Sequence, residues 1–246
     1  MSHHATCAAD PHRPRTPGDT GTAMFTVLAL MLLVSVLGLG LALTSSLEPV
    51  IVSAYESAMA ARYGAEAGVF VAAHELGDIP DWNLALSGQR RSAILDSAGP
   101  SALVLPDGRQ VDLGDLTNLA DCGHTSACTE AELNAFTTDR PWGPNNPRWH
   151  LFGHARLDRL LASGAAVPPC EVVVWVGDDP AETDGDPLRD SAPAAPGSLR
   201  PGAGLIALRV ESFGVRSAHR VLVATIGRPE FEGDGRPRVV SWQEIR

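Results

Sequence analysis

The segment from residue 177 to residue 203 holds the densest group of potential metal ligands in the chain. Five carboxylates lie close to a glycine there, from Asp178, Asp179, Glu182, Asp184 and Asp186. Hard oxygen ligands at this density suit Ca²⁺, although the spacing is not that of an EF-hand loop. Two readings stay open, namely a structural calcium site and a solvated acidic turn.

A second group of potential ligands surrounds a pair of cysteines. Cys122 and Cys128 are separated by five residues in a loop-rich segment, and in an oxidising compartment they would form a disulfide. A zinc site would need two further ligands, for which His124 and His150 are candidates, but the spacing fits no standard zinc site.

The remaining cysteines lie elsewhere. Cys170 precedes an apolar run, so we expect a buried thiol at the start of a strand, with pairing to Cys122 or Cys128 as the alternative. Cys7 lies in the polar N-terminal segment.

An aromatic and histidine cluster occupies residues 141–154. Its members are Trp142, Trp149, His150, Phe152 and His154. A surface for carbohydrate or a protein partner is one reading; the other is that the two tryptophans fill the core beneath a proline-rich turn.

Composition argues against several classes of function. The chain contains no lysine, which removes the Schiff-base amine and the phosphate-binding lysine of nucleotide-binding loops, and it contains no standard catalytic motif. The net charge of −10 supplies no basic stripe for phosphates. We therefore expect neither an enzyme nor a partner of nucleic acid.

The longest element that the sequence predicts is a helix that begins with an apolar run near the N-terminus. Residues 23–43 carry no charge, and this length matches the roughly 30 Å hydrocarbon core of a bilayer. The run is too long for a secretory signal and no cleavage motif of that kind follows it. Arg13 and Arg15 precede the run and Glu48 follows it, which predicts a cytoplasmic N-terminus and a large C-terminal part outside.

The helix is predicted to continue far beyond the membrane. Residues 44–76 are rich in alanine and glutamate, and Gly77 with Asp78 gives a stop signal. Pro49 predicts a kink but not an end. The small residues of this half could face neighbouring helices or the protein's own sheet; they are Ala54, Ala58, Ala61, Ala65 and Ala72.

Two features of this helix resemble the minor type IV pilins of the PilX type and, more distantly, the K-type pseudopilin of type II secretion. The stretch Gly21-Thr22-Ala23-Met24-Phe25 looks like a prepilin site, which implies cleavage between Gly21 and Thr22 by prepilin peptidase. The stretch that includes Tyr63, Ala65, Glu66, Ala67 and Gly68 is similar to a motif found well down the helix of such proteins.

One position departs from the pattern of major pilins. The fifth residue after the proposed cut is Thr26, where major pilins carry a glutamate that is thought to pair with a neighbour's N-terminal amine during assembly. The resemblance therefore implies a minor subunit that primes or caps a filament and whose partners are other pilins and the inner-membrane assembly platform.

The rest of the chain is predicted to be α+β. Residues 81–97 look helical, 102–113 read as a hairpin around Pro106-Asp107-Gly108, and helices are expected near 129–136 and 155–162. Strands are predicted at 171–176, 204–215, 220–226 and 239–242, as an antiparallel sheet laid on the helix.

These patterns predict three parts: a leader (1–21), a long helix (22–76) and an exported α+β domain (77–246) with an acidic, proline- and glycine-rich loop at 177–203. The function expected is assembly of a pilus-like filament. The alternative is a membrane-anchored module that binds calcium, glycan or a protein without entering a filament.

Overall fold

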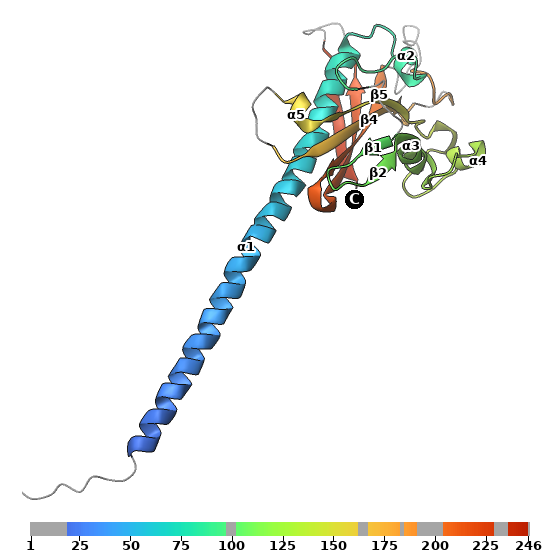
Figure 1. Ribbon diagram of the computed structural model, residues 1–246. Coiled ribbons are helices and arrows are strands. Elements are labelled where there is room, and N and C mark those ends of the chain that lie inside the picture. Colours follow the sequence, from blue (N-terminus) through green and yellow to red (C-terminus); the bar gives the residue numbers. More distant parts are fainter. Residues whose placement is uncertain are drawn as a thin grey trace, which may run out of the picture. The chain divides into compact units, whose positions relative to one another are not determined.

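The computed structural model describes residues 19–96, 102–161, 167–182, 185–190, 204–228 and 236–245. The chain divides into two compact units, residues 1–52 and 53–246, and each is described by itself. Helix α1 (Asp19–Gly77) contributes to both units, because its residues from Ser53 onward belong to the second (Figure 1). The second unit thus begins earlier than the predicted domain start at residue 77.

The described part of the first unit is one apolar helix. Every side chain from residue 21 to residue 52 whose burial is described is exposed to the surroundings of the isolated chain. The helix is long and apolar enough, by length and composition, to cross a membrane. The hydroxyl groups of Thr26, Ser35 and Thr44 donate to carbonyls of the preceding turn, with 2.6 Å between Thr44 Oγ1 and the Gly40 carbonyl, so these three donors are satisfied within the helix.

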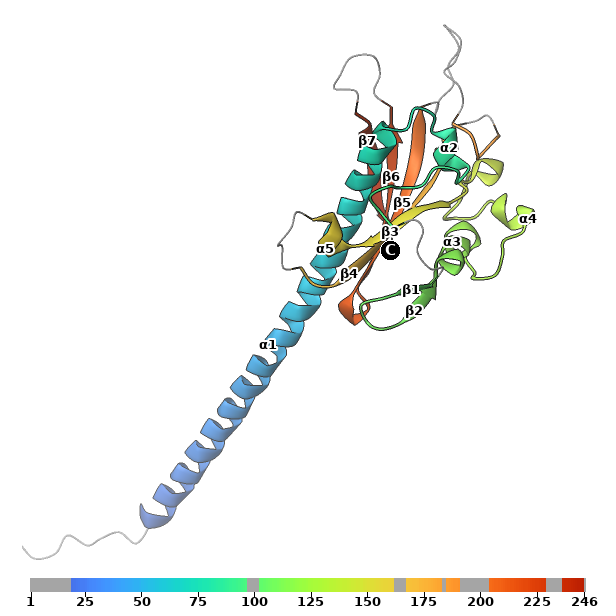
Figure 2. The same cartoon turned by 45° about the horizontal axis from the view of Figure 1, so that its top comes forward.

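The second unit is built on a five-stranded antiparallel sheet. The strand order β3-β4-β5-β6-β7 follows the chain order, so neighbouring strands are also neighbours in sequence (Figure 2). The strands are β3 (His150–Arg156), β4 (Cys170–Asp178), β5 (Leu205–Gly214), β6 (His219–Gly227) and β7 (Arg238–Ile245). A separate hairpin pairs β1 (Ala102–Val104) with β2 (Gln110–Asp112).

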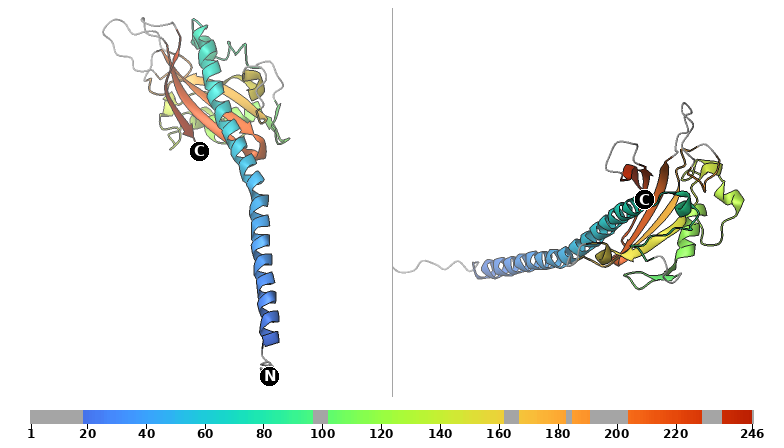
Figure 3. Two further views of the ribbon diagram at one scale, coloured as in Figure 1. Left: turned by 90° about the vertical axis from the view of Figure 1, so that its left-hand side faces the viewer. Right: turned by 90° about the horizontal axis from the view of Figure 1, so that it is seen from above.

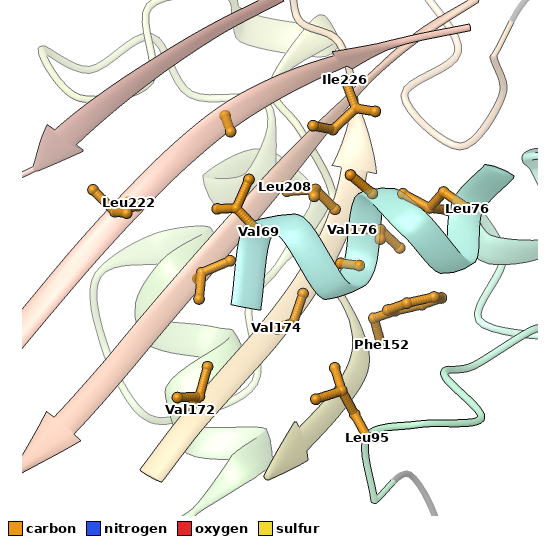
Figure 4. Packing of buried hydrophobic residues seen from close by; sticks show 14 of the residues in the cluster. Val69, Leu76, Leu95, Phe152, Val172, Val174, Val176, Leu208, Leu222 and Ile226 are labelled. Atoms are coloured by element: carbon orange, nitrogen blue, oxygen red, sulfur yellow. The ribbon is translucent and has the colours of Figure 1, made fainter. Parts of the chain in front are cut away.

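The two faces of this sheet carry two different covers. One face packs on the second half of α1, through a core that includes Val69, Leu76, Val174 and Leu208 (Figure 4). The opposite face packs on helix α3 (Leu113–Cys122) and the β1–β2 hairpin (Figure 3). Alternation along the strands produces both cores, since Val174 and Val176 face α1 while Val173 and Trp175 face α3.

Small residues let α1 approach the sheet closely. A Cβ on Gly68 would lie 2.8 Å from methyl groups of both Val172 and Val210, so only glycine fits there without a shift. Ala61, Ala65 and Ala72 are fully buried, whereas Ala54 is exposed. Most of the alanine series therefore covers the protein's own sheet, which decides between the two readings for those residues.

Polar contacts tie the helix and the sheet together. The Ser57 hydroxyl donates to the Val215 carbonyl at 2.5 Å, and the Ser212 hydroxyl donates to the Ala61 carbonyl. Near the helix end, the Glu75 carboxylate accepts from the Ser92 hydroxyl and from the backbone N–H of Ala93 (2.6 Å) and of Ile94 (3.0 Å).

Capping residues fix where the short helices α3 and α4 begin and where α3 ends. Asp112 caps α3 by accepting from the N–H of Gly114, and Gly123 ends that helix in the left-handed region at φ 81°. Helix α4 (Glu130–Leu133) begins with a capping box between Thr129 and Glu132. The other short elements are α2 (Asn83–Leu86), η1 (Gly143–Asn145), α5 (Leu157–Leu160) and η2 (Val215–Ser217).

Several predicted elements differ from the structure. The helix expected at 81–97 is only α2, because Gly88 turns at φ +70° and Glu75 then captures the backbone N–H groups of the following residues. The helix expected at 155–162 is only α5, since Ala155 and Arg156 belong to β3. The helix expected at 129–136 is the shorter α4. Helix α3 and strand β3 were not predicted.

The predicted strands and the predicted hairpin are confirmed. Four predicted strands correspond to β4, β5, β6 and β7, and the predicted hairpin corresponds to β1 and β2. The class is α+β, with a long apolar N-terminal helix whose second half packs on an antiparallel sheet. Helix α1 ends at Gly77 as predicted and begins at Asp19. Residues 1–18 of the predicted leader lie outside the described residues.

Candidate functional site

An open apolar groove of about 890 Å³ lies beside α1 in the second unit. One wall is the face of α1 that does not pack on the sheet, and the other is formed by α5 and the residues that precede β4. We call it the α1–α5 groove. Its lining residues are Tyr55, Glu56, Met59, Ala60, Tyr63, Glu66, Ala67, Phe70, Leu157, Leu161, Val167 and Pro168.

Large aromatic side chains on the groove stay exposed. Tyr55, Tyr63 and Phe70 are 65%, 56% and 64% exposed, and their spacing along α1 places them on one helical face. A contiguous apolar surface of this kind is typical of an interaction site. Helical spacing explains why the sequence folds this way, because the same helix puts alanine and glycine toward the sheet and aromatics away from it.

The charge on this groove is mainly negative. Glu56 and Glu66 line it, and Arg62 pairs with Glu66 at 3.1 Å in an i,i+4 arrangement. The hydrogen bond and charge of Glu66 raise the pKa of Arg62. The groove therefore offers an apolar floor with carboxylates at its edge.

The predicted helix motif is divided between the two sides of α1. Tyr63, Glu66 and Ala67 line the groove, whereas Ala65 and Gly68 pack on the sheet. The motif thus serves both packing of the domain and the shape of its free surface.

The predicted cleavage residues Gly21 and Thr22 lie in the first turns of α1. A Cβ on Gly21 would meet nothing within 4 Å. Thr26 donates its hydroxyl to the Ala23 carbonyl at 2.8 Å, so this side chain is engaged with its own helix.

The structure joins Cys122 and Cys128 by a disulfide, with Cα atoms 6.0 Å apart. This bond links the end of α3 to the start of α4. His124 lies in the closed loop, with Nδ1 3.7 Å from Cys122 Sγ and Nε2 3.1 Å from Glu132 Oε1. His150, the other histidine considered for zinc, is on β3, where burial lowers its pKa.

Cys170 is a buried free thiol at the start of β4, as expected. Its Sγ lies 3.0 Å from the point where a Cβ on Gly64 would stand. Burial, with Glu171 nearby, raises the pKa of Cys170 to about 12.

The acidic segment is less exposed than a solvated turn would be. Asp178, Asp179 and Glu182 are buried, Asp186 is half-buried, and Asp184 lies outside the described residues. Burial raises the pKa of Asp179. Among the described residues, the group with ligand atoms close enough to share an ion is Cys122, His124 and Glu132. The calcium site stays a prediction.

The aromatic cluster at 141–154 does not form one surface. Trp149 and Phe152 are buried, on opposite faces of the sheet, whereas Trp142 is 42% exposed. The reading in which both tryptophans fill the core is correct for Trp149 and wrong for Trp142.

Two of the buried carboxylates that sequence reasoning missed join segments that are remote in the chain. One is Glu75, described above. The other is Asp190, which accepts from the N–H of Gly204 at 2.6 Å and lies 3.6 Å from Arg228. No sequence motif distinguishes either, because their partners are remote in the chain.

Comparison with known proteins gives no match: no protein-family model, no curated protein and no solved structure is significantly similar to this chain. The functional argument therefore rests on the chain's own residues.

Proposed function

We propose that this chain is a minor pilin or pseudopilin that takes part in assembling, priming or capping a type IV pilus-like filament. It is held in a bacterial inner membrane by the first half of α1, with the sheet domain outside the cytoplasm. Its partners are prepilin peptidase, the membrane assembly platform and other pilins or pseudopilins.

The observation that carries this proposal is the division of one helix into two kinds of surface. Residues 21–52 expose apolar side chains all round, while residues 53–77 bury one face on a sheet. A simple tether would need only the length that crosses a bilayer, about 20 residues. In this chain the helix also forms part of the core of the exported domain. This suits a subunit whose helix and domain are extracted from the membrane together during assembly.

The α1–α5 groove supports the same proposal. Tyr63 and Phe70 expose apolar area that the second unit does not itself cover. Lateral contact with a neighbouring subunit would bury that area. Burial of apolar surface stabilises a contact by about 25 cal/mol per Å². Thr26 supports a minor role, since it offers no carboxylate to a neighbour's amine.

Leader processing tests the proposal. The full chain is produced in cells with active prepilin peptidase and in cells with an inactive form, and the membrane-extracted protein is examined by intact mass and N-terminal sequencing. We expect a product that begins at Thr22 only with the active peptidase. Gly21→Val should block this cleavage, whereas Gly18→Val, also in the predicted leader, serves as the matched control and should not.

An intact leader in cells with active peptidase would overturn the proposal. That result would favour the membrane-anchored binding module instead, with the acidic segment or the groove as its binding surface.

A further inference from the structure

The loop closed by Cys122 and Cys128 contains more than a disulfide. His124 lies inside the loop, and its Nδ1 is 3.7 Å from Cys122 Sγ. Zinc held by a thiolate at about 2.3 Å and an imidazole at about 2.0 Å in tetrahedral geometry separates sulfur and nitrogen by about 3.5 Å. The sulfur and the ring nitrogen therefore already stand at the separation that a shared zinc ion requires.

The other nitrogen of His124 is held as it is in many zinc sites. Its Nε2 lies 3.1 Å from Glu132 Oε1. Zinc-bound histidines commonly donate their second N–H to a carboxylate, which fixes the tautomer and the ring orientation. A carboxylate oxygen can only accept, so this contact is satisfied when Nε2 carries a proton, and in the neutral ring the lone pair is then on Nδ1.

Helix α4 fixes Glu132 itself. Its Oε2 accepts from the Thr129 N–H and from the Thr129 hydroxyl, each at 2.8 Å. The support of His124 is thus built into the capping box.

Two other groups compete for Nδ1. The Ser126 hydroxyl lies 3.0 Å away and can donate to it, and the Ser126 carbonyl lies 3.1 Å away. The carbonyl would favour a proton on Nδ1, but the charged carboxylate on the other nitrogen is the stronger acceptor. An ion at Nδ1 would replace the Ser126 hydroxyl.

We propose that the reduced form of this loop binds one Zn²⁺ through Cys122, Cys128 and His124, with Glu132 positioning the histidine and water in the fourth position. Zinc and the disulfide exclude each other, so the loop between α3 and α4 is closed by zinc in a reducing environment and by the disulfide in an oxidising one. The inference is independent of filament assembly and of leader cleavage.

Exchange of the disulfide for zinc takes place in two steps, reduction and metal binding. A dithiol reductant passes two electrons and two protons to the Cys122–Cys128 disulfide and becomes a cyclic disulfide itself. The two protein thiols then lose their protons as Zn²⁺ binds, so that each zinc taken up releases two protons to solvent.

The test uses the full chain in detergent micelles, in a background that carries His3→Ala, His4→Ala, Cys7→Ser and His12→Ala to remove the zinc ligands in the N-terminal segment. Protein is reduced with dithiothreitol, desalted under nitrogen and titrated with Zn²⁺ in competition with a chromophoric chelator. We expect one zinc per reduced chain and none for the disulfide form prepared alongside. Co²⁺ should give a thiolate-to-metal charge-transfer band only in the reduced form.

Variants then assign the ligands. Cys122→Ser with Cys128→Ser should raise the Kd by more than about 100-fold, because both thiolates are lost. Glu132→Gln should raise the Kd by about 10- to 100-fold. Glutamine preserves the capping box, so that change leaves α4 in place. His74→Ala, an exposed histidine on α1, is the matched control and should leave the Kd unchanged.

The proposal fails if the reduced background protein binds zinc no more tightly than the variant without the two cysteines. It also fails if the circular dichroism of the reduced protein is native and no cobalt–thiolate band develops. A Kd unchanged by Glu132→Gln would remove the positioning role of that residue.

Discussion

The two halves of helix α1 obey opposite packing rules. In residues 21–52 leucine and valine point outward on every side, and Gly38 and Gly40 have no neighbour within 4 Å. In residues 53–77 leucine points to the sheet and Gly64 and Gly68 touch it. The same residue types therefore have different surroundings in the two halves. Apolar side chains are exposed in the first half, as suits lipid, and are buried in a protein core in the second.

The length and the apolarity of a helix therefore do not by themselves locate a domain boundary. A continuous helical pattern runs from residue 19 to residue 77, yet the folded unit begins at Ser53. Matched substitutions in the two halves should therefore differ in their effect on the stability of the second unit. All five tryptophans lie beyond residue 80, so their fluorescence reports unfolding of the second unit.

The largest effect is expected from truncating a leucine. Leu76 is fully buried, so Leu76→Ala should lower the free energy of unfolding of the second unit by about 2–5 kcal/mol. Leu37 is 60% exposed, and Leu37→Ala should leave that free energy unchanged. Urea unfolding of the full chain in micelles measures both. Equal effects at the two positions would show that the halves do not differ as described.

Removing the charge of Glu75 should have the next largest effect. Glu75→Gln weakens hydrogen bonds to the N–H groups of Ala93 and Ile94, and bonds of this charged kind are worth about 1.5–3 kcal/mol. Glu48 on the first half of the helix is exposed, so Glu48→Gln is the matched control. We also expect faster amide hydrogen exchange at residues 92–95 in Glu75→Gln alone. Unchanged exchange there would contradict the contact.

A smaller effect is expected from adding one methyl group. Gly68→Ala places a Cβ 2.8 Å from two valine methyl groups, which costs about 1–3 kcal/mol, but alanine recovers about 1 kcal/mol of helix propensity. The net loss should be about 1 kcal/mol in the same urea assay. Gly38→Ala has open space around it and should cause no loss. A stabilised Gly68→Ala variant would mean that the helix and the sheet are further apart than described.

The smallest effect concerns pH. Residues 21–47 contain no ionisable side chain, so any pH dependence between 4 and 6 must come from elsewhere, and the buried Asp121 of the second unit is one source. Burial raises the pKa of Asp121 from 3.8 to about 6. Its contribution to stability is therefore full below pH 3.8 and is lost as pH rises through about 6.

Asp121→Asn should flatten the fall in unfolding free energy across this pH range. Burial also raises the pKa of Asp190 to about 6, so a residual slope of the same sign should remain in that variant. Thermal unfolding at several pH values provides the measurement. A slope that does not change in Asp121→Asn would contradict the assignment.

The parts that sequence predicted are those with a strong local pattern. Strands β4 and β6 are rich in valine, and the hairpin has Pro106-Asp107-Gly108 at its turn. Strand β3 was not predicted, because it contains Gly153 and two histidines and its pairing with β4 shifts register near Phe152. Helix α3 has two sequence signals, the Asp112 cap and the Gly123 end, but it has no continuous apolar run.

Some residues of the candidate sites were predicted from the sequence, whereas others depend on the tertiary structure. Tyr63 and Glu66 were predicted from the resemblance of their stretch to a known helix motif, and the pair Cys122 and Cys128 was predicted from its spacing. The wall of the groove made by Leu157 and Val167 could not be predicted, because those residues meet α1 only through the register of β3 and β4. The position of Glu132 beside His124 likewise depends on the turn between α3 and α4.

The buried position of Cys170 has a consequence for oxidative folding. The second unit holds three cysteines, which allow three different pairings. Only a thiolate attacks a disulfide, and the thiol of Cys170, with its pKa raised to about 12 once β4 has formed, supplies almost none at neutral pH. The native linkage is thereby protected from scrambling, and a chain that has folded correctly needs no isomerase to stay so.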